Sequence, residues 1–316
     1  MPFLEETFSL KNDSGQTIYG IIHHPQSPNG GLVVLFNIGL HYRVCHARLF
    51  VRQARYLQNA GFTVARFDTA GLGYSQGEIH VSRAIDSFDA IQTGLFKDDA
   101  LMVVNYLKRR FNPRKVFFSG LCGGALTGII TAAVCGDVDG VIFIAGPVTV
   151  TSAERELSML HPFEADVLFT GYLKKIFNLR AWARFFSGRT SYKDLFNSLK
   201  VKIADKFAKS QPVEEGVESQ EQLENKGDLF NRVFFQAFKR LMESGKDVLF
   251  LMPELDRATY DFDKMFAKPI LKNYTKYEKH YSISRISRAD HTFSRPESSK
   301  QLFDVTRKWM LARLNH

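Results

Sequence analysis

The sequence predicts an α/β fold in which a mostly parallel, doubly wound sheet carries an inserted helical cap. Short apolar runs alternate with helix-like segments along most of the chain, and such alternation is typical of a parallel sheet covered by helices on both faces. The run from Leu32 to Phe36 is apolar throughout, as in a strand buried on both faces. Residues 151–246 break the alternation. We therefore expect a core of residues 1–150 and 247–316 and a cap of residues 151–246.

The first predicted element is a β-hairpin, with strands from Phe3 to Leu10 and from Thr17 to His23. The Asn-Asp-Ser-Gly sequence at 12–15 between them favours a turn. The final helix, from Pro296 to Leu314, has apolar residues near helical spacing. Between these ends, strands are expected at 32–36, 63–67, 115–118, 141–144, 247–252 and 280–286, and helices near 46–60, 96–111 and 123–135.

Composition is that of a globular protein able to bury a core, with 45% hydrophobic and 24% charged residues. The net charge of +9 would suit an anionic partner, but without zinc-finger spacing, an RNP-like motif or a long basic tail we expect no nucleic-acid binding. The odd number of cysteines favours a reducing compartment. No apolar stretch approaches the ~18 residues that span a bilayer, and the acidic N-terminus lacks signal-peptide features, so a cytoplasmic protein is expected.

A nucleophile elbow is predicted at residues 119–125, which read SGLCGGA. A strand that turns at once into a helix strains its apex residue, and only small residues fit two positions before and after it. Here these are Gly120 and Gly124 around Cys122. A thiol at a helix N-terminus is favoured as the thiolate, which is the nucleophilic form. The alternative is a buried cysteine in a glycine-rich turn.

His291 and Asp256 are the candidate partners of this thiol. His291 follows the last predicted strand and precedes the last helix, which is where the base falls when nucleophile, acid and base occur in that chain order. The acid is expected after the strand that ends at Met252, and it would orient the imidazole and stabilise its cation. Spacing favours Asp256, and Glu254 and Asp261 remain as alternatives.

An oxyanion hole needs two backbone N–H groups that face the developing charge. Gly123 supplies one, and Leu40 or Gly39 in the loop NIGLHYR is expected to supply the second. Arg43, beside this loop, is a candidate for binding an anionic substrate group, as is Arg48, although solvation at the surface is favoured for each. No metal or cofactor is expected.

The predicted cap contains a basic, aromatic-rich stretch at 172–209. Its Trp182 is a candidate for contacting substrate, because the lid of such a site must cover a hydrophobic cleft. Peripheral contact of this stretch with a membrane surface is the alternative. We favour the lid.

Together these segments resemble the α/β-hydrolase superfamily over nearly the whole chain, since NIGLHYR, RFDTAGLGYSQG, GLCGGA, PELD and ADHTF occur in that family's order. In more detail, NIGLHYRVCHARLFVRQARYL, ARFDTAGLGYS, GLCGGA and YLKKIFNLRAWARFFSGR are similar to exosortase-associated hydrolases. Three positions depart from the resemblance. Cys122 stands where serine is usual, Asn37-Ile-Gly39 replaces the usual His-Gly, and Cys45 stands at a family-like glycine.

The resemblance and the motifs predict a hydrolase that acts on ester or thioester bonds of a small molecule through an acyl-enzyme on Cys122, with His291 as base and Asp256 as orienting acid. An acyltransferase with the same three residues is one alternative. The other is a non-catalytic scaffold that binds an acyl ligand beneath the cap. The retained order of Cys, Asp and His argues against the scaffold.

Overall fold

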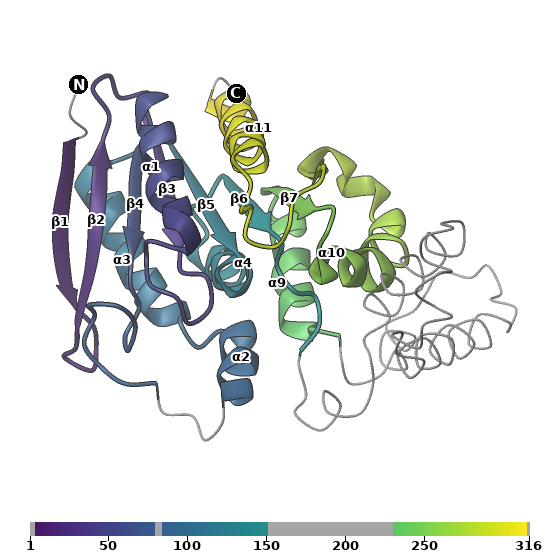
Figure 1. Ribbon diagram of the computed structural model, residues 1–316, viewed down its shortest axis with the longest axis horizontal. Coiled ribbons are helices and arrows are strands. Elements are labelled where there is room, and N and C mark those ends of the chain that lie inside the picture. Colours follow the sequence, from purple (N-terminus) through teal and green to yellow (C-terminus); the bar gives the residue numbers. More distant parts are fainter. Residues whose placement is uncertain (1–3, 80–83, 151–229, 315–316) are drawn as a thin grey trace, which may run out of the picture. The chain divides into compact units, whose positions relative to one another are not determined.

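The computed structural model describes residues 4–79, 84–150 and 230–314 (Figure 1). In this part of the chain eight strands form one sheet, in the order β1-β2-β4-β3-β5-β6-β7-β8. Only β2 among them runs against its neighbours, because it is antiparallel to both β1 and β4 while the other neighbouring strands are parallel. The strands are β1 Leu4–Lys11, β2 Thr17–His24, β3 Gly31–Phe36, β4 Thr63–Phe67, β5 Lys115–Leu121, β6 Gly140–Ile144, β7 Asp247–Pro253 and β8 Tyr281–Ile286.

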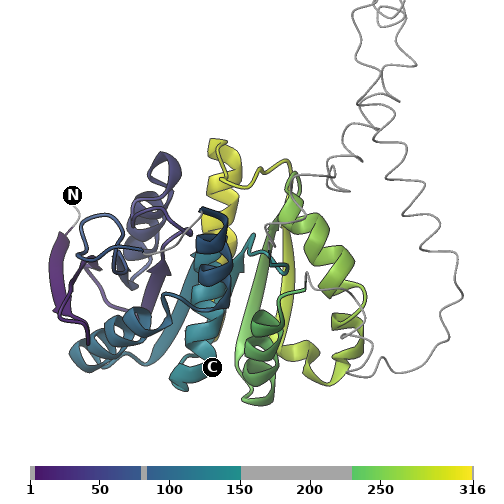
Figure 2. The same cartoon turned by 90° about the horizontal axis from the view of Figure 1, so that it is seen from below.

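Helices cover both faces of the sheet, which confirms the predicted fold class (Figure 2). The strands β3 and β6 are buried along their whole length, as the continuous apolar runs predict. The helices are α1 Leu49–Asn59, α2 Ala84–Thr93, α3 Lys97–Phe111, α4 Gly123–Cys135, α9 Arg232–Glu243, α10 Arg257–Phe262 and α11 Pro296–Leu314, with shorter helical segments η1 His46–Arg48, η2 Asp263–Ala267, η3 Leu271–Asn273 and η4 Thr275–His280.

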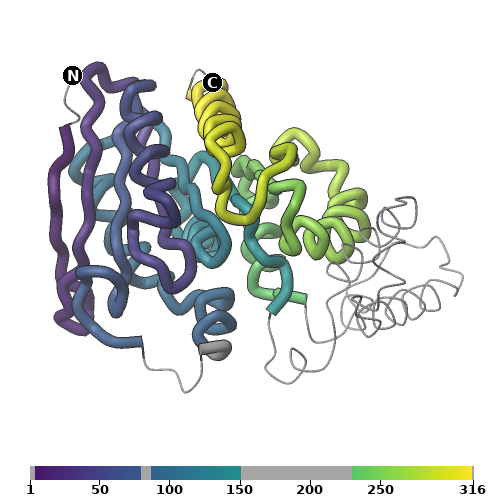
Figure 3. Tube along the Cα trace, viewed as in Figure 1, coloured from purple at the N-terminus to yellow at the C-terminus, as the bar shows by residue number. Residues whose placement is uncertain are grey.

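The first face of the sheet is covered by α1 and α11, the first and last long helices, which lie side by side (Figure 3). Leu57 of α1 and Met310 of α11 share one buried cluster with alternate residues of the central strands, such as Val33 and Leu35. This period-2 alternation is what a strand with two covered faces requires. The two helices thus cover this face of the central strands.

The second face of the sheet carries α3, α4 and α9. Helix α9 falls within the range 151–246 expected for the cap, but its Phe234 and Phe238 are fully buried against the sheet. Their ring centroids lie 5.1 Å from Phe143 and 5.8 Å from Phe250, respectively. This burial places α9 with the core, so the C-terminal boundary of the expected cap moves towards the N-terminus.

The chain leaves and rejoins this core at adjacent points. Thr149 and Phe230 form an antiparallel bridge, and the side chain of Asn231 caps α9 by accepting a hydrogen bond from the Phe234 N–H at 2.9 Å. The same Asn231 donates to the carbonyl of Gln92 at 2.9 Å. The remaining range, 151–229, with Trp182, lies outside the described residues.

The expected helix near 46–60 is interrupted at its start. Cys45, Ala47 and Arg48 have φ angles of 63°, 46° and 57°, in the region that residues other than glycine rarely adopt. The α-helix therefore begins only at Leu49. The sequence also did not predict α2 or the helical segments between β7 and β8.

Candidate active site

The predicted elbow is present where β5 ends and α4 begins. Cys122 lies between them with φ 56° and ψ −123°. A Cβ atom at Gly120 would lie 2.2 Å from the Gly124 carbonyl oxygen, and one at Gly124 would lie 2.3 Å from the Asn37 carbonyl oxygen. Because both clashes are with backbone, only glycine fits on either side of Cys122, as the sequence pattern predicts.

Cys122 is half-buried at the N-terminus of α4. Its N–H donates to the Ile144 carbonyl at 2.9 Å, which ties the elbow to the end of β6. The positive end of the helix dipole lies beside the thiol, where negative charge is stabilised. The backbone of the elbow therefore holds the thiol of Cys122 in the position that a nucleophile occupies in such a turn.

His291 contacts both Cys122 and Asp256. Its Nδ1 donates to Asp256 Oδ2 at 2.7 Å, and its ring also forms a hydrogen bond with the side chain of Cys122. Burial acts to lower the pKa of His291, but the hydrogen bonds with Asp256 and Cys122 and their negative charges outweigh it and raise this pKa to about 10. The imidazole thus bridges the sulfur and the carboxylate.

Asp256 is held by the first turn of α10. It is the N-cap of this helix, and its Oδ1 accepts a hydrogen bond from the Ala258 N–H at 3.1 Å. The backbone N–H of Leu255 donates to the Ala289 carbonyl at 2.9 Å, so the loop that carries Asp256 is joined to the loop that carries His291. One oxygen of Asp256 caps the helix while the other holds the imidazole.

The two alternative acids have other partners. Glu254 accepts hydrogen bonds from Ser287 Oγ at 3.0 Å and from the Arg288 N–H at 2.7 Å. Asp261 lies 3.8 Å from the guanidinium of Arg257. Of the three carboxylates that the sequence leaves open, the geometry brings Asp256 to His291.

The loop after β3 lies against the start of α4. The His41 N–H donates to the Ile38 carbonyl at 2.9 Å, and this turn leaves the N–H groups of its two central residues, Gly39 and Leu40, unused by the turn itself. A Cβ at Gly123 would lie 3.0 Å from Gly39 Cα. The expected donors Gly123 and Leu40 therefore come from backbone segments that meet beside Cys122.

Arg43 occupies a different place from the one that the sequence suggests. Its side chain is 12% exposed and forms an ion pair with Asp68, whose side chain is fully buried. The guanidinium of Arg43 therefore has a buried partner within the protein and is not a solvated surface group. The sequence assigned Asp68 no role, because nothing in its local sequence shows that it is buried or that Arg43 is its partner.

Two further histidines, His41 and His46, lie near His291. The rings of His41 and His46 are in edge contact, with centroids 4.2 Å apart. Burial, followed by the charges of His41 and His291, lowers the pKa of His46. A second imidazolium is disfavoured beside His291, so His46 is neutral at neutral pH.

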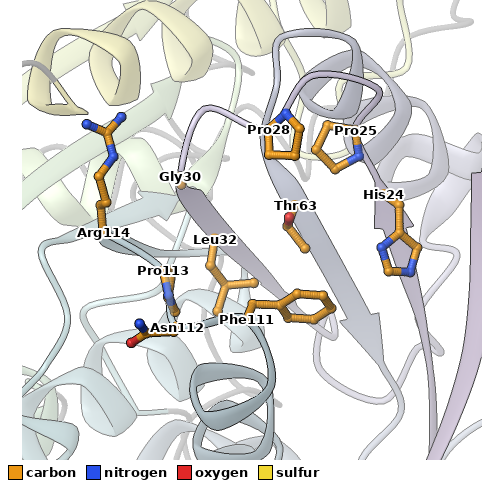
Figure 4. A pocket seen from close by; sticks show the side chains of 11 residues that line it. His24, Pro25, Pro28, Gly30, Leu32, Thr63, Phe111, Asn112, Pro113 and Arg114 are labelled. Atoms are coloured by element: carbon orange, nitrogen blue, oxygen red, sulfur yellow. The ribbon is translucent and has the colours of Figure 1, made fainter.

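A separate cavity of about 300 Å³ lies at the amino ends of the parallel strands β3 and β4 (Figure 4). Its lining includes Leu32 at the start of β3, Thr63 at the start of β4 and Phe111 at the end of α3. Cys122, Asp256 and His291 lie instead beyond the carboxyl ends of β5, β7 and β8, where ligands of open α/β sheets bind. This cavity is therefore distinct from the candidate active site.

Within residues 4–79, 84–150 and 230–314, no group of three or more His, Cys, Asp or Glu side chains is arranged to hold a metal ion. Among the same residues, no helix combines the length and the apolar composition needed to cross a bilayer.

Solved structures with the same fold cover nearly all of this chain. The esterase Pf2001 from Pyrococcus furiosus is 11% identical with a TM-score of 0.57, covering 98% of this chain and 91% of its own. Est1E from Butyrivibrio proteoclasticus, solved with ferulic acid, is 13% identical with a TM-score of 0.53, covering 98% and 100%. An α/β serine hydrolase without a lid from Xanthomonas campestris is 14% identical with a TM-score of 0.50, covering 98% and 96%.

At these identities the likeness concerns the fold, and the family is shown by sequence. A search of curated protein sequences finds no match. The model of a hydrolase family described as "Serine aminopeptidase, S33" matches residues 31–253, which is more than half of the chain and includes the elbow and β3 to β7. The chain therefore belongs to this family of α/β-hydrolases and is an α/β-hydrolase enzyme.

Proposed function

We propose that the protein hydrolyses ester or thioester bonds through an acyl-enzyme formed on Cys122. The observation that carries the proposal is the contact of His291 with both Cys122 and Asp256 at the elbow. A nucleophile, a base and an orienting acid linked in this way define the catalytic triad by geometry, whatever the sequence positions. We assign these three roles to Cys122, His291 and Asp256.

The reaction would proceed in two steps. Because its pKa is raised to about 10, His291 holds the proton at neutral pH, and Cys122 Sγ attacks the carbonyl carbon as the thiolate. The carbonyl oxygen becomes an oxyanion, held by the N–H groups of Gly123 and of Leu40 or Gly39. His291 then gives its proton to the leaving alcohol or thiol, and the acyl group remains on sulfur. In the second step His291 takes a proton from water, which attacks the thioester and releases the acid.

The cysteine is the point on which this chain differs from the serine hydrolases it is similar to. A serine at the elbow would need His291 to remove its proton during attack, whereas a thiol can be ionised beforehand by the helix terminus and the histidine. The same acyl-enzyme could pass its acyl group to an alcohol or amine in place of water. We therefore keep acyl transfer as the alternative outcome of the same first step.

The subgroup, the cap and the cellular compartment of the protein are proposed from its sequence. The similarity to exosortase-associated hydrolases covers the loop after β3, the loop after β4 and the elbow, and we propose membership of that group. Residues 151–229 are proposed as the helical cap, with Trp182 facing substrate. The three cysteines are free thiols, which supports a reducing compartment such as the cytoplasm.

Intact-protein mass spectrometry with a panel of p-nitrophenyl esters and acyl thioesters tests the proposal. The parent protein should gain the mass of the acyl group, and Cys122→Ala should not. Cys135→Ala is the matched control, because it removes a thiol from the other end of α4, and it should acylate like the parent. If no substrate gave an adduct or a product, the non-catalytic scaffold would be favoured. If an acylated alcohol or amine formed faster than the free acid, the transferase would be favoured.

A further inference from the structure

Asp68, just after β4, has a fully buried carboxylate. Its Oδ1 accepts hydrogen bonds from the Arg43 N–H at 2.5 Å and from Asn37 Nδ2 at 3.2 Å. Its Oδ2 accepts from the Arg43 guanidinium and from the Tyr74 N–H at 3.3 Å. A buried carboxylate with this many donors is a fixed element of its surroundings, because leaving such a charge unpaired is costly.

These bonds join the two ends of the loop after β3. Asn37 is the first residue after that strand and Arg43 lies six positions later, so one carboxylate holds both ends. Asn37 Nδ2 also donates to the His41 carbonyl at 3.1 Å. The turn enclosed by these bonds is the one that contains Gly39 and Leu40, the candidate oxyanion donors.

The loop after β4 is shaped to leave room for this carboxylate. A Cβ at Gly73 would lie 2.3 Å from Asp68 Oδ2, so glycine is required there. The guanidinium of Arg43 lies 5.0 Å from the centroid of the Tyr74 ring, within the range of a cation–π contact. Ser75 Oγ donates to the Asp68 carbonyl at 2.7 Å, which fixes the backbone of the carboxylate as well.

We propose that Asp68, together with Arg43 and Asn37, is a positioning group that sets the geometry of the oxyanion loop. The inference rests on the proposed function, since it concerns the same site. An oxyanion hole works because its donors are already aimed before charge develops, and Asp68 fixes the segment that supplies one of them. Here Asn37, at the position where the superfamily usually has histidine, provides the amide that links loop and carboxylate.

This role separates two reactions of the same thiol. Hydrolysis of an ester passes through an oxyanion and needs the loop. Alkylation by iodoacetamide displaces iodide at a saturated carbon, forms no oxyanion and needs only the thiolate. Loss of Asp68 should therefore slow the first reaction and spare the second.

The test compares Asp68→Asn with the parent in both reactions. With a p-nitrophenyl ester that the parent hydrolyses, kcat should fall at least ~10-fold while KM stays within ~3-fold, because the lost interaction acts in the transition state. The rate of Cys122 alkylation should stay within ~2-fold. Asp139→Asn is the matched control. Asp139 also pairs with a cation, Lys115, and accepts a backbone N–H, but it lies at the amino ends of β5 and β6, away from the loop after β3. It should leave both rates unchanged.

Arg43 provides a second pair of variants should Asp68→Asn fail to fold. Arg43→Met should lower kcat in the same way, and Arg43→Lys should restore most of it by returning a cation to Asp68. Unchanged kcat in both Asp68→Asn and Arg43→Met would overturn the proposal. Equal losses of hydrolysis and alkylation would also overturn it, because the network would then act on the nucleophile or on the fold.

A structural readout separates this proposal from the proposed function. Amide hydrogen exchange of residues 37–43 should be faster in Asp68→Asn than in the parent, and unchanged in Asp139→Asn. A parent protein that hydrolyses none of the esters would refute the proposed function, while unchanged exchange in Asp68→Asn would refute the positioning role itself.

Discussion

At the scale of single residues, the two ends of α4 give two cysteines opposite environments. Cys122 lies at the N-terminus of this helix, at the positive end of its dipole, and Cys135 is its last residue, at the negative end. The third cysteine, Cys45, is buried, and burial raises its pKa to about 12. Iodoacetamide near neutral pH should therefore modify Cys122 first, as read by peptide mapping over time. Faster modification of Cys135 would contradict the assignment of the elbow.

The role proposed for Asp256 can be tested with a matched pair of variants. Asp256→Asn should lower turnover at least ~10²-fold, because the amide neither favours the productive tautomer of His291 nor stabilises its cation. Glu254→Gln changes a carboxylate two residues away that binds Ser287 and Arg288, and it should keep nearly full turnover. Steady-state kinetics with one ester decides, and the reverse pattern would move the acid to Glu254.

Residue chemistry could be predicted from sequence as far as local motifs extend. Cys122, Asp256 and His291 each follow a predicted strand in a recognisable order, and the structure brings them together. Asp68 could not be identified in this way, because what distinguishes it is complete burial and a partner in another loop. The pairing of Arg43 with Asp68 could not be predicted for the same reason, since a sequence does not say which arginines face a buried carboxylate.

At the scale of elements, the elbow depends on how closely α4 approaches the end of β3. A Cβ at Gly124 would meet the carbonyl oxygens of Asn37 and Phe36 at 2.3 and 2.5 Å. Gly124→Ala should therefore destabilise the protein by roughly 1–3 kcal/mol, the usual cost of overpacking, and disturb the oxyanion loop that starts at Asn37. Urea unfolding and ester turnover measure the two effects.

Gly128→Ala is the control on the same helix. Its Cβ would lie 3.3 Å from a ring carbon of Phe36, which is a side chain that can adjust, and alanine favours the helix. This variant should keep its stability and its turnover. Equal stability of the two variants would show that the close approach at Gly124 does not restrict the sequence.

Elements with continuous apolar runs were predictable, whereas boundaries set by tertiary packing were not. The strands β3 to β7 read directly as buried runs. Helix α9 has an apolar face at Phe234, Phe238 and Leu241 that would suit a lid as well as a core, so its pattern could not assign it to the sheet. The break before α1 depends on unusual backbone at Cys45, which no propensity indicates.

At the scale of the whole molecule, a buried histidine on β2 links stability to pH. His23 is fully buried, and its Nε2 accepts a hydrogen bond from Arg66 Nε at 2.9 Å, which requires the neutral ring. Burial, followed by the charge of Arg66, lowers the pKa of His23 to about 4. The unfolded chain binds this proton near pH 6.5 and the folded protein does not, so stability is lost as the pH falls from about 6.5 to about 4.

The size of this effect is on the order of 3 kcal/mol once pH 4 is reached. The free energy of unfolding, measured in urea at pH 7 and pH 5, should fall for the parent. His23→Gln should show a smaller fall, because glutamine can accept from Arg66 and does not titrate. Identical pH dependence in the two proteins would show that His23 is not the group responsible.

The backbone of residues 45–48, between the oxyanion loop and α1, also bears on where local unfolding begins. Three of the four residues 45–48 have positive φ angles, namely Cys45, Ala47 and Arg48. Each such conformation costs on the order of 1–3 kcal/mol, which neighbouring contacts must offset. Local opening of this junction releases that cost, so it requires less free energy than separating the strands of the sheet. We therefore expect this junction to open before the strands separate, so heat or denaturant should abolish ester turnover before it melts the sheet.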